Sequence, residues 1–178
     1  MSRLDQKPLW VLSVPPGEGK SLWVYDDLDT IKAGREETAG RLSLIETVVP
    51  PRGGPPPHTH ARESESLYIL EGELEILGDG GRTTGIGPGG FVHFPQGVLH
   101  RFHNPTDRQS RILIIFTPAG FEEFFLEIGE PYTEGSRPPK VTEEYIARAD
   151  EIGRRYGQTI FPEGRGNGAG GGNGGGPS

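Results

Sequence analysis

Short apolar runs rich in β-forming residues recur along the chain, and clusters of turn residues separate them. Runs of this kind at close spacing are typical of an all-β sandwich or barrel. Glycine (29) and proline (17) make up about a quarter of the 178 residues, which favours tight turns over long helices. The predicted strands are Trp10–Val14, Leu22–Tyr25, Leu42–Val49, Leu67–Leu70, Leu74–Leu77, Phe91–Phe94, Leu99–His103 and Arg111–Phe116.

Two helices are predicted after these strands. A first apolar stripe at i, i+3, i+4 and i+7 ends before Gly129 and consists of Phe121, Phe124, Phe125 and Ile128. A second stripe begins after an N-cap residue, Thr142, stops at Gly157, and consists of Tyr145, Ala149, Ile152 and Tyr156. We expect both helices to pack on the outside of the barrel.

The chain has the length of one domain and contains no internal repeat. We therefore expect residues 1–163 to form a single barrel together with its two helices. Residues 164–178 are dominated by glycine and carry no large apolar side chain that could offset the entropy of ordering. This composition predicts a disordered tail without a catalytic role.

Charge and composition exclude several classes of function. A net charge of −7 without any basic run argues against a nucleic-acid partner. The chain has no cysteine, so any metal must be held by nitrogen and oxygen. No apolar segment is long enough for a signal-peptide core or a membrane span, and we expect a cytoplasmic protein. A strand at Trp10–Val14 could pair with a second subunit, which favours a homodimer.

All five histidines lie between positions 58 and 103. His58 and His60 are two residues apart, so on an extended strand their side chains point to the same face. Both imidazoles could then reach one ion at about 2.0–2.2 Å. By itself, a His-x-His pair is weak support for a metal site.

A carboxylate near this pair needs a separate argument. Glu65 lies five residues after His60, and this odd offset would place it on the opposite face of an unbroken strand. The polar segment 61–64 predicts a turn, followed by a new strand that begins at Glu65. Strand parity alone leaves Glu63 open as the alternative ligand.

The strand after the turn at Pro95 to Gly97 carries a third candidate imidazole. Alternation places His100 and Phe102 on one face and His103 on the other, so His100 and His103 should not bind the same ion. His93 precedes the turn, and we expect it to be a surface imidazole or a neighbour of the ligands rather than a ligand.

With these residues in place, the sequence resembles the cupin superfamily. Its two motifs are G-x5-H-x-H-x3,4-E-x6-G and G-x5-P-x-G-x2-H-x3-N. One departure is that Gly53 lies five rather than six positions before His58, which affects a turn and not a ligand. The residues that match fixed positions are His58, His60, Glu65 and Gly72 in the first motif and Gly89, Pro95, Gly97, His100 and Asn104 in the second.

The resemblance implies a jelly-roll β-barrel, the cupin double-stranded β-helix, with one divalent transition metal inside it. The implied ligands are His58, His60, Glu65 and His100. Three imidazoles and one carboxylate suit Ni, Fe, Co, Mn, Cu or Zn and leave one or two coordination positions free. The sequence favours none of these metals over the others.

Residues 58–72 and 118–125 further resemble bacterial quercetin-dioxygenase-like cupins with a single barrel. This resemblance implies a dioxygenase that uses O2 to cleave or oxidise a flavonol-like or enolisable aromatic small molecule. Glu65 would then be both a ligand and the base that takes the substrate's proton. The residues expected to line the substrate pocket or to fill the core are Leu67, Ile69 and Phe102.

Two alternative functions remain open. One is a non-oxidative metal cupin (isomerase, decarboxylase or cyclase), and the other is a non-catalytic cupin that binds a small molecule.

Overall fold

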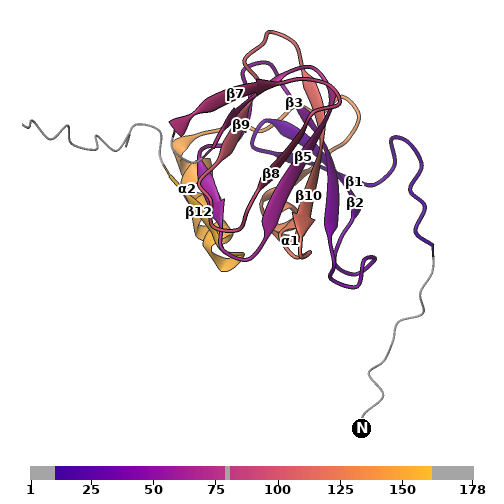
Figure 1. The fold of residues 1–178 in the computed structure, drawn as a ribbon. Coiled ribbons are helices and arrows are strands. Elements are labelled where there is room, and N and C mark those ends of the chain that lie inside the picture. Colours follow the sequence, from indigo (N-terminus) through magenta and orange to yellow (C-terminus); the bar gives the residue numbers. More distant parts are fainter. Residues whose placement is uncertain (1–10, 79–80, 162–178) are drawn as a thin grey trace, which may run out of the picture.

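The computed structural model describes residues 11–78 and 81–161 (Figure 1). The elements alternate between short strands and tight turns up to residue 117, and the two helices follow, as the sequence predicts. Their bounds are β1 Lys20–Val24, β2 Asp27–Ala33, β3 Ser43–Val49, β4 His58–His60, β5 Ser64–Glu71, β6 Leu74–Leu77, β7 Thr83–Ile86, β8 Phe91–Phe94, β9 Arg101–His103, β10 Ser110–Thr117, α1 Glu122–Ile128, β11 Glu130–Pro131, α2 Glu143–Arg155 and β12 Gln158–Ile160.

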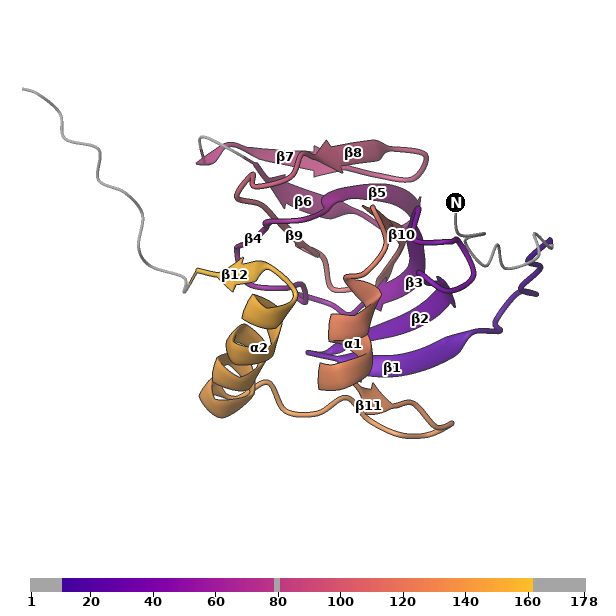
Figure 2. The same cartoon turned by 90° about the horizontal axis from the view of Figure 1, so that it is seen from below.

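The strands form three antiparallel sheets that together enclose the core. The largest has the order β11-β1-β2-β3-β10-β5-β8, a second has the order β7-β6-β9, and β12 pairs with β4. Figure 2 shows β1, β2 and β3 along one side of the ring of strands and β6, β7 and β8 along the other. The all-β fold predicted from the sequence is confirmed.

Alternating burial along the strands defines the inner face of the barrel. In β3 and β10 every second residue is buried, including Ile45, Val49, Ile112 and Phe116, while their neighbours are only partly covered. The inner face of β2 is different, because its buried residues include acidic side chains. This strand was not predicted from the sequence.

Both predicted helices are present and lie outside the ring of strands (Figure 2). The hydroxyl of Thr142 accepts a hydrogen bond from the backbone N–H of Tyr145 at 3.2 Å, which caps the first turn of α2. Gly129 ends α1, and the apolar stripe of this helix is buried against the barrel. The hydrophobic periodicity therefore located both helices correctly.

The strand predicted at Trp10–Val14 is not confirmed. The described part of that segment, Val11–Val14, has no strand structure, and the first strand begins at Lys20. Val11 is 92% exposed, so its β-forming side chain packs against no neighbouring strand. β propensity is realised only where such a neighbour is present. Trp10 and the predicted tail at 164–178 lie outside the described residues.

Candidate metal centre

His58, His60, Glu65 and His100 converge inside the barrel from three neighbouring segments. His58 and His60 are the ends of β4, Glu65 lies near the start of β5, and His100 directly precedes β9. The backbone N–H groups of His58 and His100 each donate to the other's carbonyl at 3.0 Å. This reciprocal pairing places the two imidazole rings side by side, with centroids 4.5 Å apart.

The four side chains present their donor atoms to one point. The Oε2 atom of Glu65 lies 3.0 Å from Nε2 of His60, 3.1 Å from Nε2 of His100 and 3.8 Å from Nε2 of His58. All four donor atoms lie within 4.8 Å of one another, and all four residues are buried. Two donors that bind one ion at about 2.0–2.2 Å lie roughly 3–4 Å apart, so the cluster could hold a metal ion.

Backbone carbonyls set the tautomers of two of the imidazoles. Nδ1 of His58 lies 2.8 Å from the carbonyl oxygen of Pro56, and Nδ1 of His100 lies 2.8 Å from that of Val98. A carbonyl only accepts, so in the neutral ring Nδ1 carries the proton and Nε2 presents a lone pair. Two lone pairs then face the Glu65 carboxylate, an arrangement that a cation between them would stabilise. The donor set therefore fits a metal.

The donors at the site differ in how their pKa values are shifted. Burial alone would lower the pKa of His100, but the neighbouring Glu65 carboxylate raises it above its usual value. Burial lowers the pKa of His60 to about 4, so this ring is neutral at physiological pH. Burial alone would raise the pKa of Glu65, but its interactions with the imidazoles of His100, His58 and His60 hold it well below its usual range. A neutral imidazole and an ionised carboxylate are the forms that bind metals.

The remaining candidates lie away from this cluster. Glu63 is buried but does not belong to the group of donors, and burial raises its pKa to about 7. His103 lines a pocket on the other side of β9, as the predicted alternation requires. His93 is exposed and hydrogen-bonds with Ser66 at 2.9 Å.

A cavity of about 40 Å³ lies beside three of the four donors, His58, His60 and Glu65. Much of its wall is aromatic, and the ring of Phe121 contacts that of His60 edge to face, with centroids 4.3 Å apart. Of the three expected pocket residues, Phe102 lines this cavity. Leu67 and Ile69 are fully buried in β5 and belong to the hydrophobic core rather than to the cavity wall.

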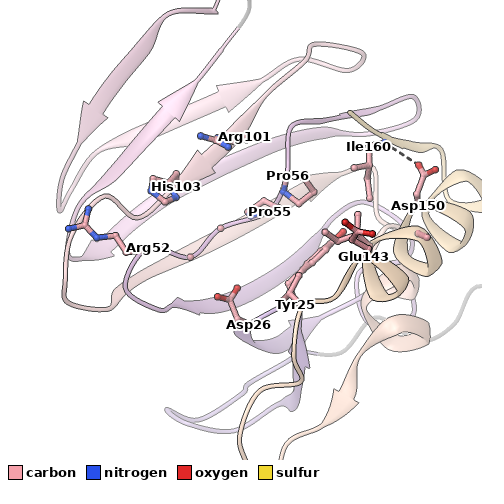
Figure 3. Close-up of a pocket in the computed structure, with 15 residues that line it drawn as sticks. Tyr25, Asp26, Arg52, Pro55, Pro56, Arg101, His103, Glu143, Asp150 and Ile160 are labelled. Atoms are coloured by element: carbon pink, nitrogen blue, oxygen red, sulfur yellow. Dashed lines mark hydrogen bonds between the residues drawn. The ribbon is translucent and has the colours of Figure 1, made fainter. Parts of the chain in front are cut away.

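A larger and more open pocket of about 870 Å³ lies between α2, the segment that precedes β4 and the outer side of β9 (Figure 3). Arg52, Arg101 and His103 lie toward one end of this pocket, and Glu143 and Asp150 lie on α2 at the other. Tyr25 and Pro55 line both this outer pocket and the small inner cavity. These two residues therefore lie between the outer pocket and the inner cavity.

Four polar residues of the inner cavity were missed by the sequence reasoning, namely Tyr25, Asp27, Asp29 and Gln158. The available signal was the pair of acids two residues apart, directly after a β-type run. Acids at that spacing on a strand usually mark its solvent face, so this pattern does not by itself predict a buried pair.

The fold and the cluster together define a class of protein, a small β-barrel with one potential N/O metal site inside it. Comparison with known families agrees, because the family model for the cupin domain matches residues 45–116. This match includes the four residues that converge here, which are the metal ligands implied by the resemblance to cupins.

Known proteins extend this similarity. The chain is 29% identical over 116 residues to a quercetin 2,3-dioxygenase of Bacillus subtilis. The aligned region covers 65% of this chain and 34% of that enzyme. The chain thus spans about a third of the length of this relative. A predicted oxalate decarboxylase from Thermotoga maritima superposes with a TM-score of 0.56 at 18% identity, over 60% of this chain and 98% of that one. An RmlC-like cupin from Shewanella frigidimarina superposes with a TM-score of 0.53 at 20% identity, over 62% of this chain and 94% of that one. At these identities the two structures support the fold alone.

Within the described residues, no helix is long and apolar enough to cross a membrane.

Proposed function

We propose that this protein is a metal-dependent dioxygenase of the quercetinase-like type, which uses O2 to cleave or oxidise a flavonol-like or enolisable aromatic compound. The observation that carries the proposal is the buried cluster of His58, His60, Glu65 and His100 beside a cavity with aromatic walls. The sequence similarity to a quercetin 2,3-dioxygenase supports the choice of reaction.

The four donors would hold one divalent transition metal. Such a metal supplies a Lewis acid that stabilises an oxyanion, with one or two coordination positions open to small molecules. The imidazoles of His58 and His100 are fixed in orientation by their Nδ1 hydrogen bonds, which keep Nε2 directed at the site. Water would be excluded from the candidate metal centre by the apolar rings that line the inner cavity, among them Phe102, Phe116 and Phe121.

In this proposal Glu65 has two roles. As an ionised carboxylate it is a ligand, and as a base it takes the proton of the incoming enolic or phenolic hydroxyl. Its Oε2 atom is the point on which the three imidazoles converge, so a substrate oxygen that reaches the ligands also comes within reach of this carboxylate.

The size of the inner cavity restricts how a substrate can bind. Pockets that bury drug-sized ligands have volumes of roughly 300–1,000 Å³, and the inner cavity has about 40 Å³. Only an oxygen-bearing edge of the substrate would enter it. The outer pocket of about 870 Å³ could hold the remainder, with the edge passing between Tyr25 and Pro55.

A non-oxidative reaction, such as isomerisation, decarboxylation or cyclisation, is the second candidate. The observation that favours it is a pair of buried acids in the same cavity, Asp27 and Asp29, because buried acids could transfer protons to a substrate in a step that needs no O2. A cupin that only binds a small molecule would require neither these acids nor four intact donors.

The test is elemental analysis of untagged protein, followed by loading with each candidate metal and measurement of O2 uptake on a panel of flavonols and other enolisable aromatics. The proposal expects one metal per chain and O2 consumption that matches substrate loss. Substrate conversion without O2 uptake would establish the non-oxidative alternative. Protein with one metal per chain that binds panel compounds but converts none would contradict both enzymatic functions.

A further inference from the structure

The inner face of β2 brings two carboxyl groups into the cavity beside the candidate metal centre. Asp27 and Asp29 are two residues apart on this strand, are 5% and 2% exposed, and line the cavity together with His58, His60 and Glu65. Neither acid belongs to the group of donors. They therefore form a second polar group in the same cavity.

The two carboxyl groups differ in their hydrogen bonds. The hydroxyl of Thr47 on β3 donates to Oδ1 of Asp29 at 2.5 Å. Oδ1 of Asp27 is buried and has no hydrogen-bond partner within the described residues. A buried polar atom without a partner destabilises the folded protein. A strand that served only to fill the core would place apolar side chains at these positions.

Burial also affects the protonation of the pair. It raises the pKa of Asp29 to about 7, although the hydrogen bond from Thr47 acts in the opposite direction. Burial, with repulsion from Asp29 and Asp26, raises the pKa of Asp27 well above its usual range. Both shifts favour the protonated forms of the two acids more than in an ordinary exposed aspartate.

A residue that lines the same cavity, Tyr25, carries a further unpartnered atom. The hydroxyl of Tyr25 is buried and has no hydrogen-bond partner within the described residues. A volume of about 40 Å³ accommodates the oxygen atoms of a small group, and each such atom, like a buried water, needs two or more polar partners. Asp27 and Tyr25 could supply them, which points to a polar ligand atom at this end of the cavity.

We propose that Asp27 and Asp29 are a proton-donating pair that contacts the substrate, and that the substrate carries a second oxygen, a carbonyl or hydroxyl, beside the hydroxyl that meets the His/Glu cluster. This inference rests on the proposed enzymatic function and names a feature of its substrate. In the step, the O–H bond of one carboxylic acid breaks as an O–H bond forms on the substrate oxygen. The carboxylate left behind regains its proton from water.

Asp27→Asn and Asp29→Asn test this role, because asparagine keeps the shape and a hydrogen-bond donor but cannot give up a proton. Asp107→Asn is the matched control, since Asp107 is exposed on the loop before β10. We expect all three variants to bind as much metal as the wild type. Turnover should fall by on the order of 10²–10⁴-fold in at least one of the two cavity variants and remain unchanged in Asp107→Asn.

A second measurement does not depend on turnover. Infrared spectra of wild-type protein with ¹³C-labelled aspartate should show an isotope-shifted band of a protonated carboxyl at pH 7, which Asp27→Asn or Asp29→Asn removes. Glu63 is unaffected by aspartate labelling, so its own raised pKa cannot produce this shift. The unmutated protein thus remains informative even if a variant fails to fold.

The outcomes separate this inference from the proposed function. If the wild type consumes O2 and both cavity variants keep full turnover, the proton-donating role is wrong while the dioxygenase stands. If the wild type converts no panel compound, the proposed function fails, and the labelled spectrum still decides whether the pair is protonated. A labelled spectrum at pH 7 without a protonated aspartate would overturn the inference directly.

A further expected result is that wild-type protein prefers hydroxyketones over analogues without the second oxygen, and that the affected variant loses this preference.

Discussion

At the scale of single residues, hydrogen bonds to backbone carbonyls orient the imidazoles of the candidate centre. The carbonyls of Pro56 and Val98 fix the tautomers of His58 and His100. Asn104, a fixed position of the second motif, is no ligand; its side-chain amide donates to the carbonyls of Pro50 and Arg108 and ties the end of β9 to neighbouring loops. The motif thus encodes both donors and the turns that hold them.

His100→Ala is expected to weaken metal retention and to leave the fold largely intact. The variant loses one of four donors, whereas the apolar core of the barrel remains. We expect metal affinity to fall by at least 10–100-fold. His103→Ala is the matched control, because its side chain lies on the opposite side of the same segment. Metal titration and circular dichroism decide; equal metal affinity in both variants would show that His100 is no ligand.

Glu65→Gln separates the ligand role from the proposed base role. The amide keeps one oxygen donor but removes the negative charge and the basic site. If Glu65 is also the base, turnover should remain 10²–10⁴-fold below that of the wild type even at full metal occupancy, and a higher pH should partly restore it. Glu63→Gln should retain metal and turnover, because Glu63 lies outside the donor group. Near-normal turnover of fully metallated Glu65→Gln would eliminate the base role.

At the scale of secondary-structure elements, α1 matters because it covers the donors. Phe121, the residue that precedes this helix, is 2% exposed and packs on His60, Phe116 and Phe124. The stripe predicted from the sequence is therefore both a packing surface and a wall of the cavity. The sequence pattern located the stripe, but only the fold shows that it faces the candidate centre.

Phe121→Ala should destabilise the protein by about 3–5 kcal/mol, because it removes a buried aromatic ring from the core. It should also enlarge the inner cavity and admit water to the donors. Phe91→Ala is the control, since Phe91 is 59% exposed; its free energy of unfolding should change by less than about 1 kcal/mol. Urea denaturation of both variants measures the difference. A small loss in Phe121→Ala would mean that α1 contributes little to the core.

At the scale of the whole molecule, the burial of acids predicts how stability depends on pH. The raised pKa of Asp29, about 7, means that the folded state favours its protonated form. Its stabilising contribution is fully present below the unfolded pKa of about 4 and is lost as the pH rises through about 7. Asp27 and Asp29 repel each other when both are ionised, and Thr47 and Tyr145 also interact with Asp29.

Asp29→Asn should therefore become more stable relative to the wild type as the pH rises from about 4 to about 8, by a few kcal/mol in total. Urea denaturation of metal-free protein across this range measures the difference in free energy of unfolding. Comparison of the two proteins cancels the contributions of the histidines, which both share. Parallel stability curves would show that Asp29 ionises in the folded protein as it does in the unfolded chain.

The sequence by itself determined the parts that repeat or that carry local signals. Alternating apolar runs predicted most of the strands, the helical stripes predicted α1 and α2, and the spacing around His58, His60 and His100 matched a known pair of motifs. These signals are local because strand and helix periodicity and turn chemistry depend on near neighbours in the chain.

Only the tertiary structure decided which polar residues share the interior. It brings Glu65 and not Glu63 to the imidazoles, because the strand after the turn starts in the register that points Glu65 inward. It also turns Asp27 and Asp29 inward, against the usual preference of acids for water. Leu67 and Ile69 instead complete the core. Such choices depend on contacts between strands far apart in sequence, which no local pattern contains.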